Sequence, residues 1–78
     1  MPKQKTVHSL WFWRKKKGLT ETELGDAVGV HMTSIRRWQK DPTIIPLAMA
    51  YRLAETLNID VKQIDYEHNY KDLGEDIK

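Results

Sequence analysis

One short segment, residues 32–40, collects basic and hydroxyl side chains on a single side. If the segment is a helix and Ile35 faces inward, an advance of about 100° per residue leaves an outward side without an acid. The side chains on that side are Thr33, Arg36, Arg37 and Lys40, flanked by Met32 and Ser34. Arginine can donate two hydrogen bonds to O6 and N7 of guanine, and threonine, serine or methionine can touch a thymine methyl or a phosphate. The pattern allows two interpretations, a face that binds nucleic acid or a solvated basic face on a helical hairpin.

No other group of residues has a spacing that indicates catalysis or metal binding. The chain has no cysteine, which excludes a disulfide framework, a zinc–thiolate site and a thiol nucleophile. The three histidines lack metal-ligand spacing. The acidic clusters Glu21/Glu23 and Glu75/Asp76 are explained by a helix cap and by a charged C-terminal end. We therefore predict no catalytic residue, no metal, no cofactor and no enzymatic activity.

Charge is distributed unevenly over the 78 residues. Residues 1–64 hold 11 basic and 6 acidic residues, whereas residues 65–78 hold two basic and five acidic ones. A basic body suits an anionic partner, although the ordinary asymmetry of a solvated surface gives a similar count. No apolar run approaches the 18 residues of a membrane span, and the first residues lack the pattern of a signal peptide. We expect a cytoplasmic protein without a membrane segment.

The elements that would position the basic segment are five short helices, with no strand. We expect them at residues 6–17, 20–28, 32–40, 46–57 and 60–64. The inward stripe of the first helix, at spacing i, i+3, i+4 and i+7, consists of Val7, Leu10, Trp11 and Arg14, and Trp13 flanks it. Because Trp11, Phe12 and Trp13 are contiguous, a helix cannot bury all three on one stripe.

Several residues mark the helix ends. Thr20 and Glu23 have the spacing of a capping box at the start of the second helix, and Asp60 and Gln63 repeat it at the start of the fifth. Pro46 suits the first position of the fourth helix, and Asn58 is its expected left-handed end.

The second and third helices form a helix-turn-helix pattern. Two helices that cross steeply need a small residue where their backbones approach, and Gly25 supplies it. Gly29 supplies the positive φ that the turn requires, and Val30 fills the gap between the helices. Ile35 and Trp38 are expected to attach the pair to the core, which leaves the basic face free.

The residues on both sides of this turn resemble the XRE family, the helix-turn-helix domains of lambdoid phage repressors and Cro proteins. The matching runs are RKKKGLTETELGDAVGV at 14–30, IRRWQ at 35–39, Pro46-Leu47 and LAETLNI at 53–59. No gap is needed over residues 9–64. The resemblance implies an all-α, five-helix lambda-repressor-like domain. It also implies binding of double-stranded DNA as a homodimer on a two-fold operator, with the third helix in the major groove.

The resemblance further implies which residues touch DNA. The positions at which the family reads bases hold Met32, Thr33, Ser34, Arg36 and Arg37. The phosphate-binding candidates by family position are Thr20, Glu21, Lys40 and Thr43. Lys15 is a further candidate on charge alone, because a lysine at the basic end of the first helix attracts phosphates at long range. The candidate dimer surface, by family position, consists of Ile45, Leu47, Ile59, Val61 and Tyr66.

Three positions depart from the usual residues of the family. Glu21 replaces a glutamine, and a carboxylate beside a phosphate is repulsive. Gly25 replaces an alanine, which costs about 1 kcal/mol of helix propensity. Gln39 replaces a glutamate, so the family's ion pair with Arg14 becomes at most a hydrogen bond to a neutral acceptor.

We therefore expect a DNA-binding domain at residues 1–66, followed by an acidic, flexible tail at 67–78. The predicted function is a sequence-specific transcriptional regulator of the Cro or repressor type. Two alternatives use the same fold. One is an antitoxin whose tail folds over a toxin partner, and the other is a protein-interaction module that no longer binds DNA.

Overall fold

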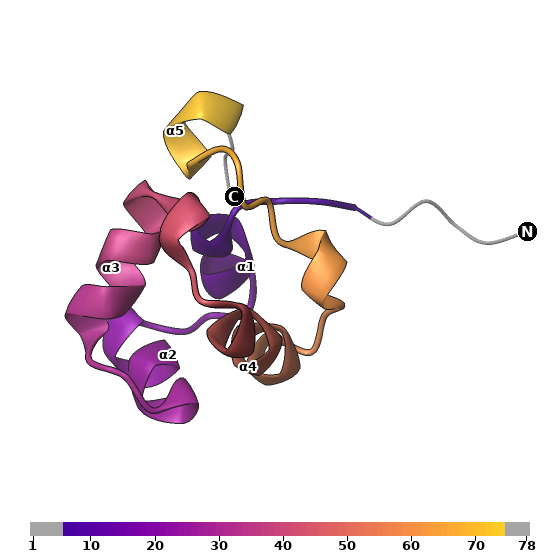
Figure 1. Cartoon of the computed structure of the whole chain (residues 1–78). Coiled ribbons are helices and arrows are strands. Elements are labelled where there is room, and N and C mark those ends of the chain that lie inside the picture. The colour runs from indigo at the N-terminus through magenta and orange to yellow at the C-terminus, as the bar shows by residue number, and fades with distance from the viewer. Residues whose placement is uncertain (1–5, 75–78) are drawn as a thin grey trace, which may run out of the picture.

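The computed structural model describes residues 6–74, and the chain in this range is helical (Figure 1). Its α-helices are α1 (Leu10–Lys16), α2 (Glu21–Val28), α3 (Met32–Lys40), α4 (Leu47–Leu57) and the single turn α5 (Tyr70–Leu73). Two 3₁₀ turns follow α3 and α4, namely η1 (Pro42–Ile44) and η2 (Val61–Gln63). No strand occurs in residues 6–74, so the predicted all-α class is confirmed. The predicted count of five helices is not, because the expected fifth helix at 60–64 is only the turn η2.

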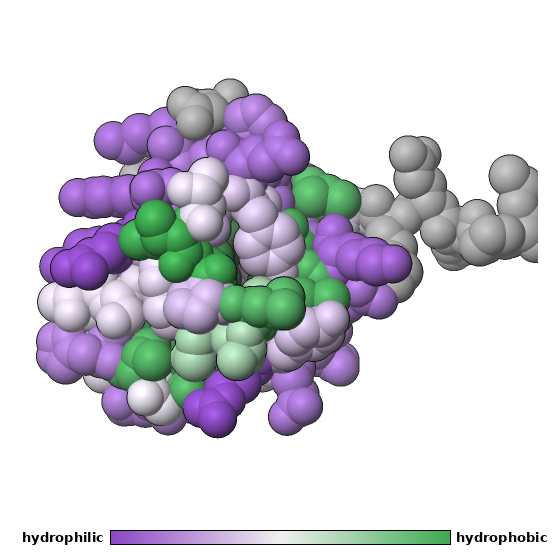
Figure 2. All heavy atoms as spheres, in the orientation of Figure 1, coloured by the Kyte–Doolittle hydropathy of each residue, from purple (hydrophilic) through white to green (hydrophobic). Residues whose placement is uncertain are grey.

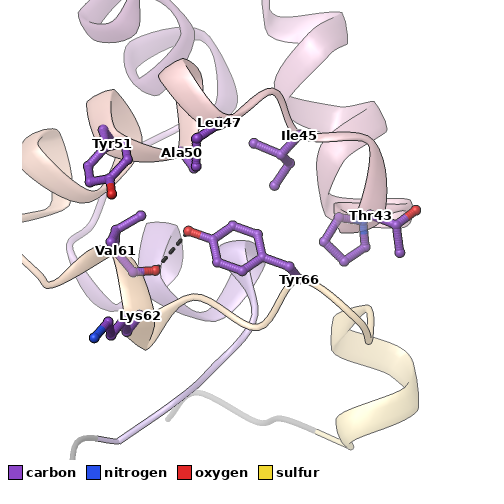
Figure 3. Close-up of a pocket in the computed structure, with 9 residues that line it drawn as sticks. Thr43, Ile45, Leu47, Ala50, Tyr51, Val61, Lys62 and Tyr66 are labelled. Carbon is purple, nitrogen blue, oxygen red and sulfur yellow. Dashed lines mark hydrogen bonds between the residues drawn. The ribbon is translucent and has the colours of Figure 1, made fainter.

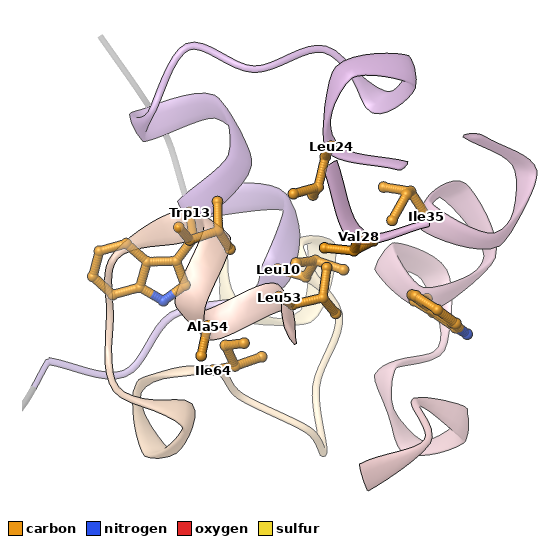
Figure 4. Close-up of a cluster of buried hydrophobic side chains, with 10 residues drawn as sticks. Leu10, Trp13, Leu24, Val28, Ile35, Leu53, Ala54 and Ile64 are labelled. Carbon is orange, nitrogen blue, oxygen red and sulfur yellow. The ribbon is translucent and has the colours of Figure 1, made fainter. Parts of the chain in front are cut away.

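One hydrophobic core joins the four longer helices to the segment after η2 (Figure 4). Its members are Leu10, Trp13, Leu24, Val28, Ile35, Trp38, Leu53, Ala54, Leu57 and Ile64. Burying a large apolar side chain contributes roughly 1.5–3 kcal/mol, and none of these helices is longer than 11 residues. The helices therefore depend on this shared core, and α3 has a fixed position relative to α1 and α4.

The first helix begins later than predicted, at Leu10 instead of Thr6. The Ser9 side chain caps it by accepting a hydrogen bond from the Phe12 N–H at 3.1 Å. The residue before the cap is extended, because the His8 N–H donates to the Gln63 carbonyl at 3.0 Å and the His8 carbonyl accepts from the Asp65 N–H at 2.8 Å. The chain near residue 8 thus pairs with residues 63–65 and cannot continue the helix.

This pairing also corrects the predicted inward stripe of α1. Val7 lies outside the helix and is exposed, and Trp11 is half-buried. Trp13 takes the core position, and its Nε1 donates to the Gln63 carbonyl at 2.8 Å. Phe12 is half-buried and stacks on the His8 ring. The expectation that one of the three contiguous aromatic residues stays partly exposed is confirmed.

The turn between α2 and α3 has the predicted geometry. Both hydrogen bonds of the capping box are present, from the Glu23 N–H to Thr20 Oγ1 at 3.0 Å and from the Thr20 N–H to Glu23 Oε1 at 2.9 Å. Gly29 ends α2 with φ +83°. A Cβ added at Gly25 would lie 2.7 Å from the carbonyl oxygen of Val30, which confirms the close approach of the two backbones.

The segments around α4 differ in detail from the prediction. The helix begins one residue later than predicted, at Leu47, so Pro46 is its N-cap and not its first residue. Asn58 ends α4 in the left-handed region with φ 56°. The capping box of Asp60 and Gln63 exists, but it closes only a 3₁₀ turn. Ile64 then becomes extended, since it is buried in the core and pairs with His8.

The segment expected to be a tail contains the turn α5, which packs near α1. Glu75 and Asp76 of this segment lie outside the described residues, as do Lys3 and Lys5 near the other end.

Candidate nucleic-acid interface

The outward side of α3 is basic, as its periodicity predicts. Ile35, Trp38 and Gln39 are buried, and they fix the opposite side of the helix. The exposed residues are Thr33, Arg36, Arg37 and Lys40, with Met32 and Ser34 half-buried beside them. Long hydrophilic side chains project from the edge of the molecule where α3 lies (Figure 2). The structure thus brings the five predicted base-reading residues together on one helix.

The start of α3 is held by side chains from the turn. The His31 ring caps the helix, since its Nδ1 accepts a hydrogen bond from the Thr33 N–H at 3.1 Å. The Thr33 hydroxyl lies 3.0 Å from the same nitrogen. On the other side, the Thr22 hydroxyl donates to Met32 Sδ at 3.4 Å. Met32 and Thr33 are therefore positioned before any ligand arrives.

A chain of polar contacts runs from α1 through α3 to the start of α2. Arg14 is buried, and its Nε donates to Gln39 Oε1 at 2.7 Å. Gln39 Nε2 donates to Glu21 Oε2 at 2.6 Å. The other carboxylate oxygen of Glu21 accepts from Arg36 Nη2 at 3.1 Å and from Arg36 Nε at 3.3 Å. The prediction of a neutral-acceptor bond between Arg14 and Gln39 is confirmed.

The contact between Glu21 and Arg36 was not predicted from the sequence. The two residues are 15 positions apart, on different helices, and neither belongs to the core stripe. One signal in the sequence could have indicated it. Compared with the usual residues of the family, the chain gains a carboxylate at position 21 and loses one at position 39.

Burial, hydrogen bonds and charges in this chain of contacts shift two pKa values. Burial raises the pKa of the Glu21 carboxyl. Hydrogen bonds from Arg36 and Gln39 and the charges of Arg36 and Arg14 outweigh that effect, so the pKa lies below its ordinary value. Burial lowers the pKa of the Arg14 guanidinium, and the negative charge of Glu21 opposes this shift. Glu21 is therefore a carboxylate at neutral pH.

The predicted phosphate-binding residues fall into two places. A polar hollow of about 580 Å³ beside the start of α2 is lined by Lys15, Thr20 and Glu21, together with Arg14, Gly18 and Leu19. Lys40, the last residue of α3, and Thr43 in η1 are exposed. The hydroxyl of Thr20 serves the capping box, and that of Thr43 donates to Asp41 Oδ1 at 2.5 Å. Lys15 Nζ lies 5.8 Å from the centre of the Trp11 ring.

A second, apolar feature lies between α4 and η2. This groove has a volume of about 470 Å³. Figure 3 draws the side chains that line it, and Figure 2 shows apolar side chains on this face beside the hydrophilic edge. Its lining consists of Pro42, Thr43, Ile45, Leu47, Ala50, Tyr51, Val61, Lys62 and Tyr66. Leu47 is 73% exposed and Tyr51 is 57% exposed. Four of the five candidate dimer residues line this groove, whereas Ile59 packs against the core.

The Tyr66 ring forms one wall of the groove. Its hydroxyl donates to the Val61 carbonyl at 2.7 Å (Figure 3). Burial, followed by the charges of Tyr51 and Asp60, raises the pKa of Tyr66 to about 12. The hydroxyl therefore stays protonated and keeps this wall in place at neutral pH.

The geometry of α2, the turn and α3 agrees with a comparison of the chain against protein families. A family model described as helix-turn-helix matches residues 13–64, more than half of the chain. The chain belongs to the XRE-type helix-turn-helix family. Membership in this DNA-binding family implies double-stranded DNA as a partner. No curated protein and no solved structure gives a significant match.

Two further findings concern the part of the chain that the structure describes. No helix in it is long and apolar enough to cross a lipid bilayer. It also contains no group of three or more histidine, aspartate or glutamate side chains that could hold a metal ion.

Proposed function

We propose that this XRE-type protein is a sequence-specific transcriptional regulator of the Cro or repressor type, which acts in the cytoplasm and inserts α3 into the major groove of DNA. The observation that supports this best is the outward side of α3. It presents two arginines and a lysine without an acidic residue, while its inward side is fixed by Ile35 and Trp38. A rigid helix with exposed guanidinium groups is suited to read base edges.

We assign base reading to Met32, Thr33, Ser34, Arg36 and Arg37. Arg37 is the strongest candidate for a guanine contact, because it is exposed and no hydrogen bond or ion pair holds its side chain within the described residues. Phosphate binding is assigned to Lys15 and Thr20, which lie beside the start of α2, and to Lys40 and Thr43, which lie at the end of α3 and in η1. Glu21 belongs to the same region, but its charge opposes a phosphate. The DNA-binding domain extends over residues 1–66 and is followed by the acidic segment 67–78.

We further propose that the protein binds a two-fold operator as a homodimer through the apolar groove. Leu47 and Tyr51 are far more exposed than ordinary apolar side chains of a folded core. The groove lies beside the α3 edge and not on it, so two copies can meet there while both α3 helices face DNA (Figure 2). The same exposed groove favours a second candidate function, an antitoxin or interaction module that binds a protein partner.

A titration of ¹⁵N-labelled protein with a short mixed-sequence duplex tests the proposed binding face without knowledge of the operator. We expect the amide shifts to concentrate at residues 20–22, 32–37, 40, 41 and 43. Arg37→Ala should weaken binding more than Arg52→Ala, a matched loss of charge at an exposed position of α4. Shifts confined to the groove residues of α4 and η2, or no DNA binding at low salt, would overturn the proposal and favour the protein-interaction function.

A further inference from the structure

The Glu21 carboxylate has a fixed position between α2 and α3. One oxygen accepts from Gln39 Nε2 at 2.6 Å, and Gln39 is itself only 5% exposed. Gln39 is held in turn by the buried Arg14 at 2.7 Å. The Glu21 side chain is 21% exposed, whereas that of Arg36 is 50% exposed. The core therefore holds Glu21, and Glu21 holds a half-exposed arginine.

The contact occupies one edge of the Arg36 guanidinium. Nε and Nη2 both donate to Glu21 Oε1, at 3.3 and 3.1 Å. A guanidinium carries five N–H groups, so three remain, and two of them point in parallel from Nη1 and Nη2 at its outer edge. Two parallel donors match two neighbouring acceptors, such as O6 and N7 of guanine or two oxygens of a phosphate.

The charge of Glu21 distinguishes between these two ligands. A phosphate at the outer edge of Arg36 would lie a few ångströms from the carboxylate, and the two negative charges would repel each other. The edge of guanine carries no net charge and avoids this repulsion. The ion pair also cancels most of the attraction that a free arginine exerts on the DNA backbone. The pair is therefore better suited to read a base than to bind a phosphate.

We propose that Glu21 is a positioning residue that determines DNA specificity. Glu21 holds the Arg36 guanidinium so that the outer edge of the guanidinium is free for a guanine, and the charge of Glu21 keeps Arg36 from phosphates. This inference rests on the proposed function of α3 in the major groove. It gives Glu21 a different role from the phosphate contact implied by its family position. Arg37 lacks such a carboxylate partner within the described residues.

The test compares Glu21→Gln with Glu23→Gln, a matched loss of charge two residues away on the same helix. Glutamine at 23 still accepts the hydrogen bond of the capping box. In the free protein, ¹⁵N relaxation of the Arg36 Nε–H should show a more mobile guanidinium in Glu21→Gln and no change in Glu23→Gln. Equal mobility of Arg36 in the wild type and in Glu21→Gln would overturn the inference without reference to DNA.

The DNA measurement uses a duplex selected by the wild type from a random library and a scrambled duplex. Glu21→Gln should bind the scrambled duplex more tightly and lose roughly tenfold in the ratio of specific to non-specific affinity. Its salt slope should steepen by about one, as for one additional phosphate contact. Equal effects of Glu21→Gln and Glu23→Gln, or an unchanged ratio in Glu21→Gln, would overturn the inference alone. A wild type that selects no sequence would overturn the proposed function, and the specificity role of Glu21 with it.

Discussion

Gly25 lies where α2 comes closest to the chain that leads into α3, and replacing it with alanine tests how tightly this turn is packed. Alanine at an interior helix position gains about 1 kcal/mol of helix propensity over glycine. The added Cβ, however, would lie 2.7 Å from the Val30 carbonyl oxygen and 3.3 Å from backbone atoms of His31 and Met32. These are backbone atoms, so no flexible side chain can move aside.

The packing cost should exceed the gain in propensity. Overpacking of this kind costs about 1–3 kcal/mol. The Val30 N–H donates to the Gly25 carbonyl at 2.9 Å, so moving the turn also strains that hydrogen bond. We expect a net loss of up to about 2 kcal/mol, which lowers the melting temperature by up to about 15 °C in a domain of this size. DNA affinity should fall as well, because the shift moves the start of α3.

Thermal and urea unfolding of Gly25→Ala and Asp26→Ala measure the two effects separately. Asp26 is the exposed neighbour of Gly25 in α2, so its replacement gains propensity without a new contact. Asp26→Ala should be neutral or stabilising. If Gly25→Ala is stabilised as much as Asp26→Ala, the close approach of the two helices is refuted.

Four further predictions follow from single residues. His31→Ala should lose about 1 kcal/mol of stability in urea unfolding, because α3 loses its cap. His31→Asn restores a hydrogen-bond acceptor and should recover most of this loss. Equal losses in the two variants would contradict the role of His31 as a cap. The folded pKa of Glu21 is depressed, so the stability from its contacts is complete above its unfolded value of 4.5 and is lost as the pH falls through the lower folded value. A stability difference between wild type and Glu21→Gln that stays constant through this acidic range would exclude that effect. Leu47→Glu should leave the free energy of unfolding within about 0.5 kcal/mol of wild type and abolish self-association in sedimentation, and an unchanged dimer would place the interface elsewhere. Lys15→Ala should weaken binding to all sequences similarly and reduce the salt slope by about 0.9, whereas an unchanged slope would argue against a phosphate role.

Features that depend on neighbours in the sequence could be predicted from it. The capping box at Thr20, the left-handed ends at Gly29 and Asn58 and the small residue at Gly25 each follow from local backbone requirements. The outward side of α3 followed from helical periodicity once Ile35 was taken as buried. These signals operate within about seven residues along the chain, so a single sequence contains them in full.

Features that depend on distant residues were missed. The start of α1 moved because His8 pairs with the chain at residues 63–65, and the same pairing stopped the expected fifth helix at Gln63. No local pattern marks this contact between the two ends of the domain. The ion pair between Glu21 and Arg36 was missed for the same reason, since it joins two helices whose relative position is set by the core.

Selection of bound duplexes from a random library, at about physiological salt, tests the central claim most directly. With Arg37→Ala run alongside the wild type, we predict an enriched inverted repeat whose half-sites lie about one helical turn apart, with at least one base preference lost in the variant. Wild type that enriches no sequence, or a variant that enriches the same sequence with equal strength, would contradict base reading by α3.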